Sequence, residues 1–218
     1  MKKLIKWLHS HHKTFWTKER LISLILSFIL LIIALLIQKV ADNYVVKTGW
    51  TPVWDILLNN IKARDIDGFI ILSTLTFTFA ILALLVVKPK YMLFTIKALS
   101  VFVITRSFFI SLTHLWIQPH QINFEPNSLG FSLYDILYNS KNDFFFSWHT
   151  WMPFLMALIF NKEKFWRNTF IITSVVFWAS VIIWHIHYSI DVFSAPFITF
   201  TIYSISKVFF KKDFELIS

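Results

Sequence analysis

The stretch Leu21–Ile37 reads LISLILSFILLIIALLI and contains no charged side chain. A bilayer core about 30 Å thick is crossed by roughly 17–25 apolar residues in a helix, so this stretch predicts a membrane span. Five further apolar segments follow along the chain: Gly68–Val87, Tyr91–Leu112, Phe144–Phe160, Asn168–Trp184 and His187–Phe210. We therefore expect an all-α bundle of six transmembrane helices. Five spans with one re-entrant segment are the nearest alternative.

The composition agrees with a protein built for lipid. Apolar residues make up 56% of the 218, and only 15% are charged, whereas soluble domains have about 25% charged residues. The chain has no cysteine, which excludes a disulfide scaffold, a cysteine zinc site and a thiol nucleophile.

The distribution of positive charge predicts the orientation. If the N-terminus is cytoplasmic, fifteen of the 21 Lys and Arg residues fall on the inner side and five on the outer side. Because short cytoplasmic loops are enriched in Lys and Arg, both termini are predicted to be cytoplasmic. The net charge of +9 is thereby explained by topology, and nucleic-acid binding is not needed to account for it. Small size and Lys-rich inner segments favour a bacterial cytoplasmic membrane.

The chain divides into three parts on this interpretation. Residues 1–20 mix Lys and His with Leu, Phe and Trp, which is typical of an amphipathic segment at the inner membrane surface. Residues 21–212 form the membrane domain, and residues 213–218 form a cytoplasmic tail. The sequence indicates no oligomeric state.

Four ionisable residues within the predicted spans should lie at one depth. Arg106 is about 15 residues, or roughly 22 Å, along a helix that runs outward. His149, His187 and Asp191 fall in the first turns of helices that run inward. Ionisable groups cost several kcal/mol in hydrocarbon, so their convergence near the outer face predicts a functional site.

These residue types suit phosphoryl transfer. His187 and Asp191 are spaced i, i+4, which on a helix places them on one face, and a carboxylate there would orient the imidazole. His149 would act as an acid and base. Arg106 would bind a phosphate, and Ser147 would add a hydrogen-bond donor at the start of its helix.

Two alternatives use the same region. His149, His185, His187 and Asp191 include zinc-ligand types, but His185 and His187 point apart on a helix and no Glu in the spans offers a general base. A transporter or channel is disfavoured because the charged residues gather at one level instead of lining a path across the bilayer.

Two short motifs resemble those of a known family. Asp143–Thr150 reads DFFFSWHT and His187–Val192 reads HYSIDV. They are similar to the D-x3-S-G-H-T and H-Y-[ST]-x-D-V motifs of the sphingomyelin synthase branch of the type 2 phosphatidic acid phosphatase superfamily. The segment from Arg106 to Thr113 resembles the arginine-containing segment that precedes these motifs.

The resemblance implies six transmembrane helices and a mechanism without metal or cofactor. His187 would attack phosphorus and become a phosphohistidine, Asp191 would orient it, and His149 would protonate the leaving oxygen. Asp143, Thr150 and Tyr188 would support them. The substrate would be a lipid phosphate in the outer leaflet, with water or a lipid alcohol as acceptor, and we favour water because it is always present.

Trp148 is the main departure from the family pattern, since the family has Gly at this position. Glycine permits positive φ and close approach of the backbone to phosphate, whereas Trp would crowd the pocket. The alternative prediction is therefore a catalytically silent membrane relative, with a binding or structural role, whose phosphate pocket is occluded by Trp148.

Overall fold

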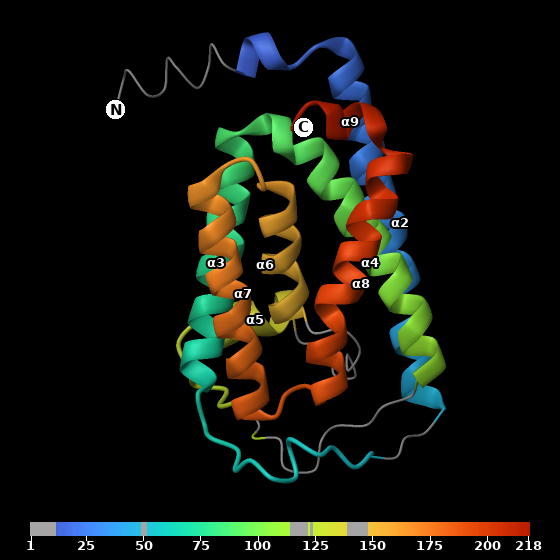
Figure 1. Cartoon of the computed structure of the whole chain (residues 1–218). Helices are drawn as coiled ribbons and strands as arrows, with labels where there is room; N and C mark the ends of the chain where they lie inside the picture. The colour runs from blue at the N-terminus through green and yellow to red at the C-terminus, as the bar shows by residue number, and fades with distance from the viewer. Residues whose placement is uncertain (1–11, 49–51, 114–121, 123, 139–147) are drawn as a thin grey trace.

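The computed structural model describes residues 12–48, 52–113, 122, 124–138 and 148–218. All regular secondary structure in these ranges is helical (Figure 1). Asp143 and Ser147 lie outside the described residues, as do His9, His11, His114 and His120.

Within the described residues, five helices are long and apolar enough to cross a membrane: α2 (Lys18–Lys47), α3 (Asp67–Val87), α4 (Pro89–Thr113), α7 (Lys164–Trp184) and α8 (Ser189–Phe209). By length and composition the chain is thus a multi-pass membrane protein. Helix α2 continues ten residues beyond the end predicted at Ile37, because Lys39 and Asp42 end the apolar run without breaking the helix.

The fourth predicted span corresponds to the short helix α6 (Trp148–Ile159), which has 12 residues. At 1.5 Å per residue it is about 18 Å long, so it does not by itself cross a bilayer core. It is nevertheless central, because it packs against α7, α8 and α4. Phe102 of α4 stacks on Trp151 of α6 with ring centroids 3.7 Å apart.

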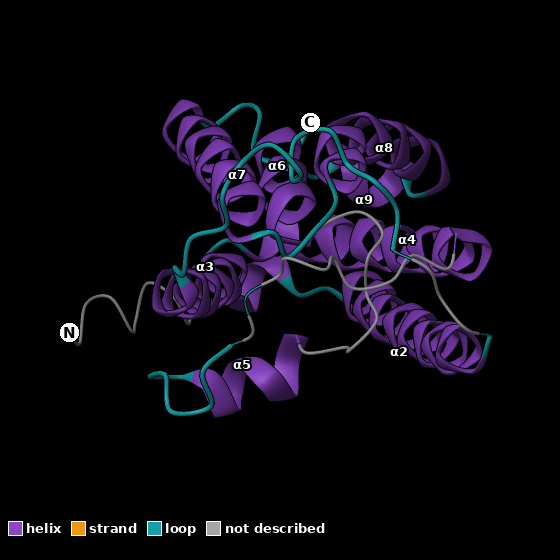
Figure 2. Cartoon of the chain, turned by 90° about the horizontal axis from the view of Figure 1, so that it is seen from below, coloured by secondary structure: helices purple, strands orange, loops and turns teal. Residues whose placement is uncertain are grey.

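Helices α2 and α3 lie on opposite sides of the bundle. Helix α2 packs along α4, and most of its apolar side chains are exposed, as expected for a helix facing lipid. Viewed along the bundle, the short helix α5 (Phe131–Tyr138) lies between α2 and α3 (Figure 2). Side chains of α2, α3 and α5 line one cavity, which is described below.

The start of α2 and the short helix α9 (Lys211–Glu215) lie at the same end of the bundle (Figure 1). Here Lys97 of α4 forms an ion pair with Asp213, and the Ser23 hydroxyl donates to Asp213 at 2.9 Å. Both members of this ion pair are buried. The turn from α7 to α8 lies at the opposite end.

Candidate functional site

Arg106, His149 and His187 line one cavity, although they come from α4, α6 and the α7–α8 turn. All three side chains are buried. The rings of His149 and His187 have their centroids 6.2 Å apart, close enough for one phosphoryl group to contact both. The structure therefore brings together the three residues that the sequence placed at one depth.

His187 does not lie on a helix with Asp191. It lies in the turn 185–188, and α8 begins only at Ser189, so the premise that i, i+4 spacing places both on one helix face is wrong. The proximity is still achieved: His187 Nδ1 lies 3.8 Å from Asp191 Oδ2. This exceeds a hydrogen-bond distance, yet it puts a fully buried carboxylate beside the ring.

The turn itself has an unusual backbone. His185 ends α7 with φ of 62°, a left-handed conformation that glycine normally supplies at this position. The N–H groups of His185 and Ile186 donate to the carbonyls of Ile182 and Val181. These bonds close α7 sharply and direct the chain into His187.

Tyr188 and Asp191 cap α8 reciprocally. Asp191 Oδ2 accepts the Tyr188 N–H at 3.2 Å, an arrangement that satisfies donors left open at a helix start. Tyr188 is buried, and its hydroxyl accepts the N–H of Val53 at 3.3 Å. Tyr188 thereby links the turn to the segment before α3, and its supporting role in catalysis stays a prediction.

His149 has a partner that the sequence did not suggest. The Tyr134 hydroxyl lies 3.2 Å from His149 Nε2, and Tyr134 belongs to α5. Among the described residues, the buried His149 Nδ1 has no hydrogen-bond partner. A buried ring nitrogen of this kind is a ready partner for a ligand oxygen.

Helix α5 is joined to α3 by a hydrogen bond and by close packing at the glycine that precedes it. The Tyr138 and Thr78 hydroxyls are hydrogen-bonded at 2.5 Å. Gly130 precedes α5 with φ of 81°, and a Cβ there would lie 3.0 Å from a Leu75 methyl. A signal was available in the sequence: Tyr134 and Tyr138 are spaced i, i+4 in a short amphipathic run.

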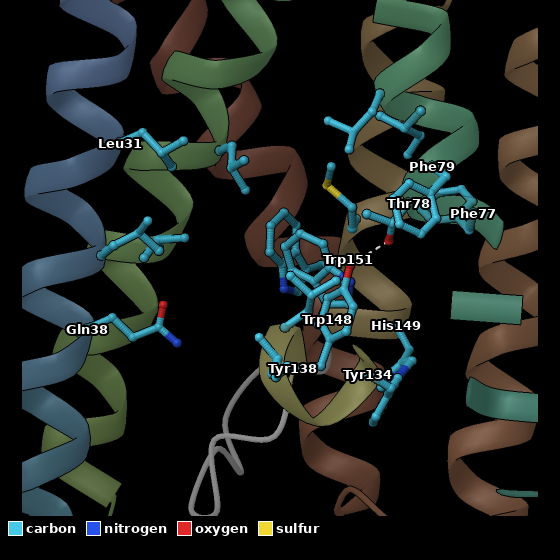
Figure 3. Close-up of a pocket in the computed structure, with 18 of the residues that line it drawn as sticks. Leu31, Gln38, Phe77, Thr78, Phe79, Tyr134, Tyr138, Trp148, His149 and Trp151 are labelled. Carbon is cyan, nitrogen blue, oxygen red and sulfur yellow. Dashed lines mark hydrogen bonds between the residues drawn. The ribbon is translucent and has the colours of Figure 1, made fainter. Parts of the chain in front are cut away.

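The cavity measures about 1630 Å³ and its lining is mostly apolar. Tyr134, Trp148 and His149 lie across it from Gln38 of α2 (Figure 3). Helices α2, α3 and α4 supply most of the remaining lining, which is mainly aliphatic and aromatic but includes Lys39, Thr78 and Thr95. One polar corner therefore adjoins a large apolar space.

Trp148 lines the cavity as the first residue of α6. It packs edge-on against Trp151 with centroids 4.7 Å apart and lies 5.7 Å from the Tyr138 ring. Within the described ranges, His185 is the only non-glycine residue with positive φ. Position 148 therefore needs no glycine for its backbone conformation, and Trp148 affects the site by its bulk.

The remaining predicted residues are placed as follows. Thr150 is buried in α6, and its carbonyl accepts the Ser174 hydroxyl at 3.1 Å, so it contributes to α6–α7 packing. His185 is buried next to the turn. In the part of the chain that the structure describes, no group of three or more His, Cys, Asp or Glu side chains is arranged to hold a metal ion.

No protein-family model, curated protein or solved structure matches this chain.

Proposed function

We propose that the chain is an integral membrane lipid phosphatase or phosphotransferase that works through a phosphohistidine at His187. The observation that carries this proposal is the pairing of His149 and His187 across 6.2 Å at one corner of a large apolar cavity. The motif resemblance described above supports the same chemistry.

The proposed reaction has two steps. A nitrogen of His187 attacks phosphorus while the bond from phosphorus to the lipid oxygen breaks, and His149 donates a proton to that oxygen. His149 then takes a proton from water or a lipid alcohol, which attacks phosphorus and releases His187. The Asp191 carboxylate stabilises the positive charge on the His187 ring, and Arg106 compensates the phosphate charge.

The cavity supports a lipid as the substrate. Typical small-molecule pockets measure about 300–1,000 Å³, whereas this one is about 1630 Å³ and largely apolar. Its walls include α2 and α3, whose outer faces carry many exposed apolar side chains. Acyl chains would fill the apolar part while the phosphate meets the histidines.

The orientation belongs to the same proposal. Lys13, Lys18, Arg20, Lys211 and Lys212 belong to the segments at the end of the bundle that holds the start of α2 and α9, and positive charge favours the cytoplasmic side. We therefore propose cytoplasmic termini, a site that faces outward, and six crossings, the fourth of which includes α6. A bacterial cytoplasmic membrane is the proposed location.

The direct test is turnover of labelled lipids by the purified protein in detergent or vesicles. Phosphatidic acid and a phosphocholine lipid would each be supplied with and without diacylglycerol or ceramide, which separates hydrolysis from transfer. We expect hydrolysis, and we expect His187→Ala to abolish it. His12→Ala is the matched control, because His12 bonds to the Val86 carbonyl, close to the end of α3 remote from the site. Full turnover by His187→Ala would refute the proposal.

A second candidate function is a catalytically silent binding protein, and the observation that favours it is the indole of Trp148 in the cavity wall. Trp148→Gly would enlarge the space beside His149, with Trp148→Phe as a control that keeps an aromatic ring. Activity that appears only in Trp148→Gly would mean that the site is intact but blocked. If neither form turns over any lipid or labels with phosphate, the silent role is favoured.

A further inference from the structure

The segment from Pro52 to Ile66, between α2 and α3, is bonded to the turn that carries His187. The Ser189 N–H donates to Asp55 Oδ2 at 2.7 Å. The Val53 N–H donates to the Tyr188 hydroxyl at 3.3 Å, and the Arg64 N–H donates to the Ile183 carbonyl at 3.0 Å. The turn and the two helix ends that flank it are thus held at three points by a segment more than a hundred residues away in sequence.

Asp55 accepts the shortest of these three hydrogen bonds. Its other oxygen, Oδ1, accepts the N–H groups of Leu57 at 3.0 Å and Leu58 at 3.1 Å, so the carboxylate is fixed to its own segment as well. Asp55 is only 6% exposed. Burial alone would raise the pKa of this carboxyl, but the hydrogen bonds from Ser189, Leu58 and Leu57 outweigh it and lower the pKa.

The position of Asp55 suits a negative charge. Ser189 is the first residue of α8, and the open N–H groups and dipole at a helix start favour an anion. Asp191 Oδ2 satisfies the Tyr188 N–H, one residue earlier. Two carboxylates therefore accept N–H groups at the start of α8. Asp191 belongs to the helix itself, and Asp55 comes from the segment before α3.

The backbone of this turn adopts a conformation that the fold has to support. His187 lies outside both α7 and α8, so no helical hydrogen bond holds its backbone. Two residues earlier, His185 has a positive φ, which is costly for any residue other than glycine. External contacts must offset that cost and keep His187 facing His149.

We propose that Asp55 is a positioning residue that holds the His187 turn in its reactive geometry through the N-terminus of α8. The contact with α8 is independent of catalysis, whereas its consequence for the rate rests on the proposed phosphohistidine function. Asp55 touches no reacting atom in this scheme; it acts through Ser189.

The first experiment measures His187 itself without requiring activity. Diethyl pyrocarbonate modifies accessible imidazoles, and mass spectrometry follows each histidine separately in the full-length protein in detergent. In Asp55→Ala we expect His187 to be modified about fivefold faster than in the wild type, the factor that matches loss of one helix cap. The rate at His12 should not change. Asp65→Ala is the matched control, since Asp65 lies on the same segment, is exposed, and bonds to the Asp67 N–H.

The second experiment separates positioning from folding. Because a displaced nucleophile loses rate rather than substrate affinity, Asp55→Ala should lower kcat about 10–100-fold and leave KM within about twofold. Asp55→Asn keeps one acceptor oxygen and should recover most of this loss. Tyr188→Phe, which removes the hydrogen bond from the Val53 N–H, should have a smaller effect of the same kind.

The outcomes can be told apart. Unchanged modification of His187 in Asp55→Ala overturns the proposal, whether or not the wild type is an enzyme. Faster modification with unchanged kcat in an active enzyme also overturns it, because the contact would then not position the nucleophile. If the wild type turns over no lipid, the proposed function fails, and the modification rates alone decide whether Asp55 holds His187.

Discussion

The ion pair between Lys97 and Asp213 allows a quantitative prediction about stability. Lys97 is 9% exposed and Asp213 is 8% exposed, and the Lys97 amine also donates to the Ser23 hydroxyl at 2.8 Å. The three residues join α4, α9 and α2. We consider the substitution Lys97→Met, which keeps most of the apolar stem and removes the charge.

The expected loss follows from what remains after the substitution. A charge-assisted hydrogen bond contributes about 1.5–3 kcal/mol, and breaking a buried pair so that one charge is left alone costs about 3–5 kcal/mol. Asp213 would keep the hydrogen bond from Ser23, which offsets part of this cost. We therefore expect Lys97→Met to destabilise the fold by about 3 kcal/mol, which is roughly a hundredfold in the unfolding equilibrium constant.

The assay is unfolding of the purified protein by SDS titration in mixed micelles at neutral pH. Adding Asp213→Leu to Lys97→Met should restore stability to within about 1 kcal/mol of the wild type, because replacing both charges removes the unpaired one. Lys211→Met is the control, since Lys211 lies at the same end, is 78% exposed and forms only a loose pair with Glu215 at 3.9 Å.

Two results would refute this reasoning. One is a loss below about 1 kcal/mol in Lys97→Met, the range of an exposed pair. The other is a double variant whose loss equals the sum of the two single losses, which would mean that the charges do not interact.

Three further predictions concern the opposite end of the bundle. Tyr134→Phe removes the hydroxyl beside His149 and should lower kcat about tenfold with little change in KM, because the His149 ring loses its orientation while substrate binding is kept. An unchanged kcat would exclude a role for Tyr134 in orienting His149. Gly130→Ala forces a methyl against Leu75 at a positive φ and should cost about 1–3 kcal/mol, measured by the same SDS titration, whereas Gly68→Ala has open space and serves as its control. The lowered pKa of Asp55 means that its stabilisation is complete above the ordinary value of 3.8 and is lost as the pH falls through the lowered pKa. The thermal midpoint of the wild type should thus fall more steeply below about pH 4 than that of Asp55→Asn, and parallel curves would contradict the assignment.

The membrane architecture could be predicted from the sequence because hydropathy is a local property. An apolar run such as Leu21–Ile37 must be helical in lipid, where every backbone hydrogen bond has to be made within the segment. The start of α3 and the ends of α4 were predicted within two residues for this reason. The length of α2 was not predicted, because the helix continues past the end of its apolar run and hydropathy does not mark where it stops.

The candidate site could be predicted only in part. Composition and spacing pointed to Arg106, His149 and His187, because ionisable residues are rare in apolar helices and stand out individually. The relation between His187 and Asp191 required the fold, since residues 185–188 leave the helix and α8 starts only at Ser189.

The sequence by itself determined that this is a multi-pass helical membrane protein with a small set of ionisable side chains within its apolar segments. The tertiary structure alone decided which groups pair at the two ends of the bundle: Tyr134 with His149 and Asp55 with the start of α8 at one end, and Asp213 with Lys97 at the other. The two acidic contacts join residues more than a hundred positions apart, and all three depend on how helices and turns pack. Packing depends on the shapes of all the side chains at once, so no local pattern around any one of these residues contains it.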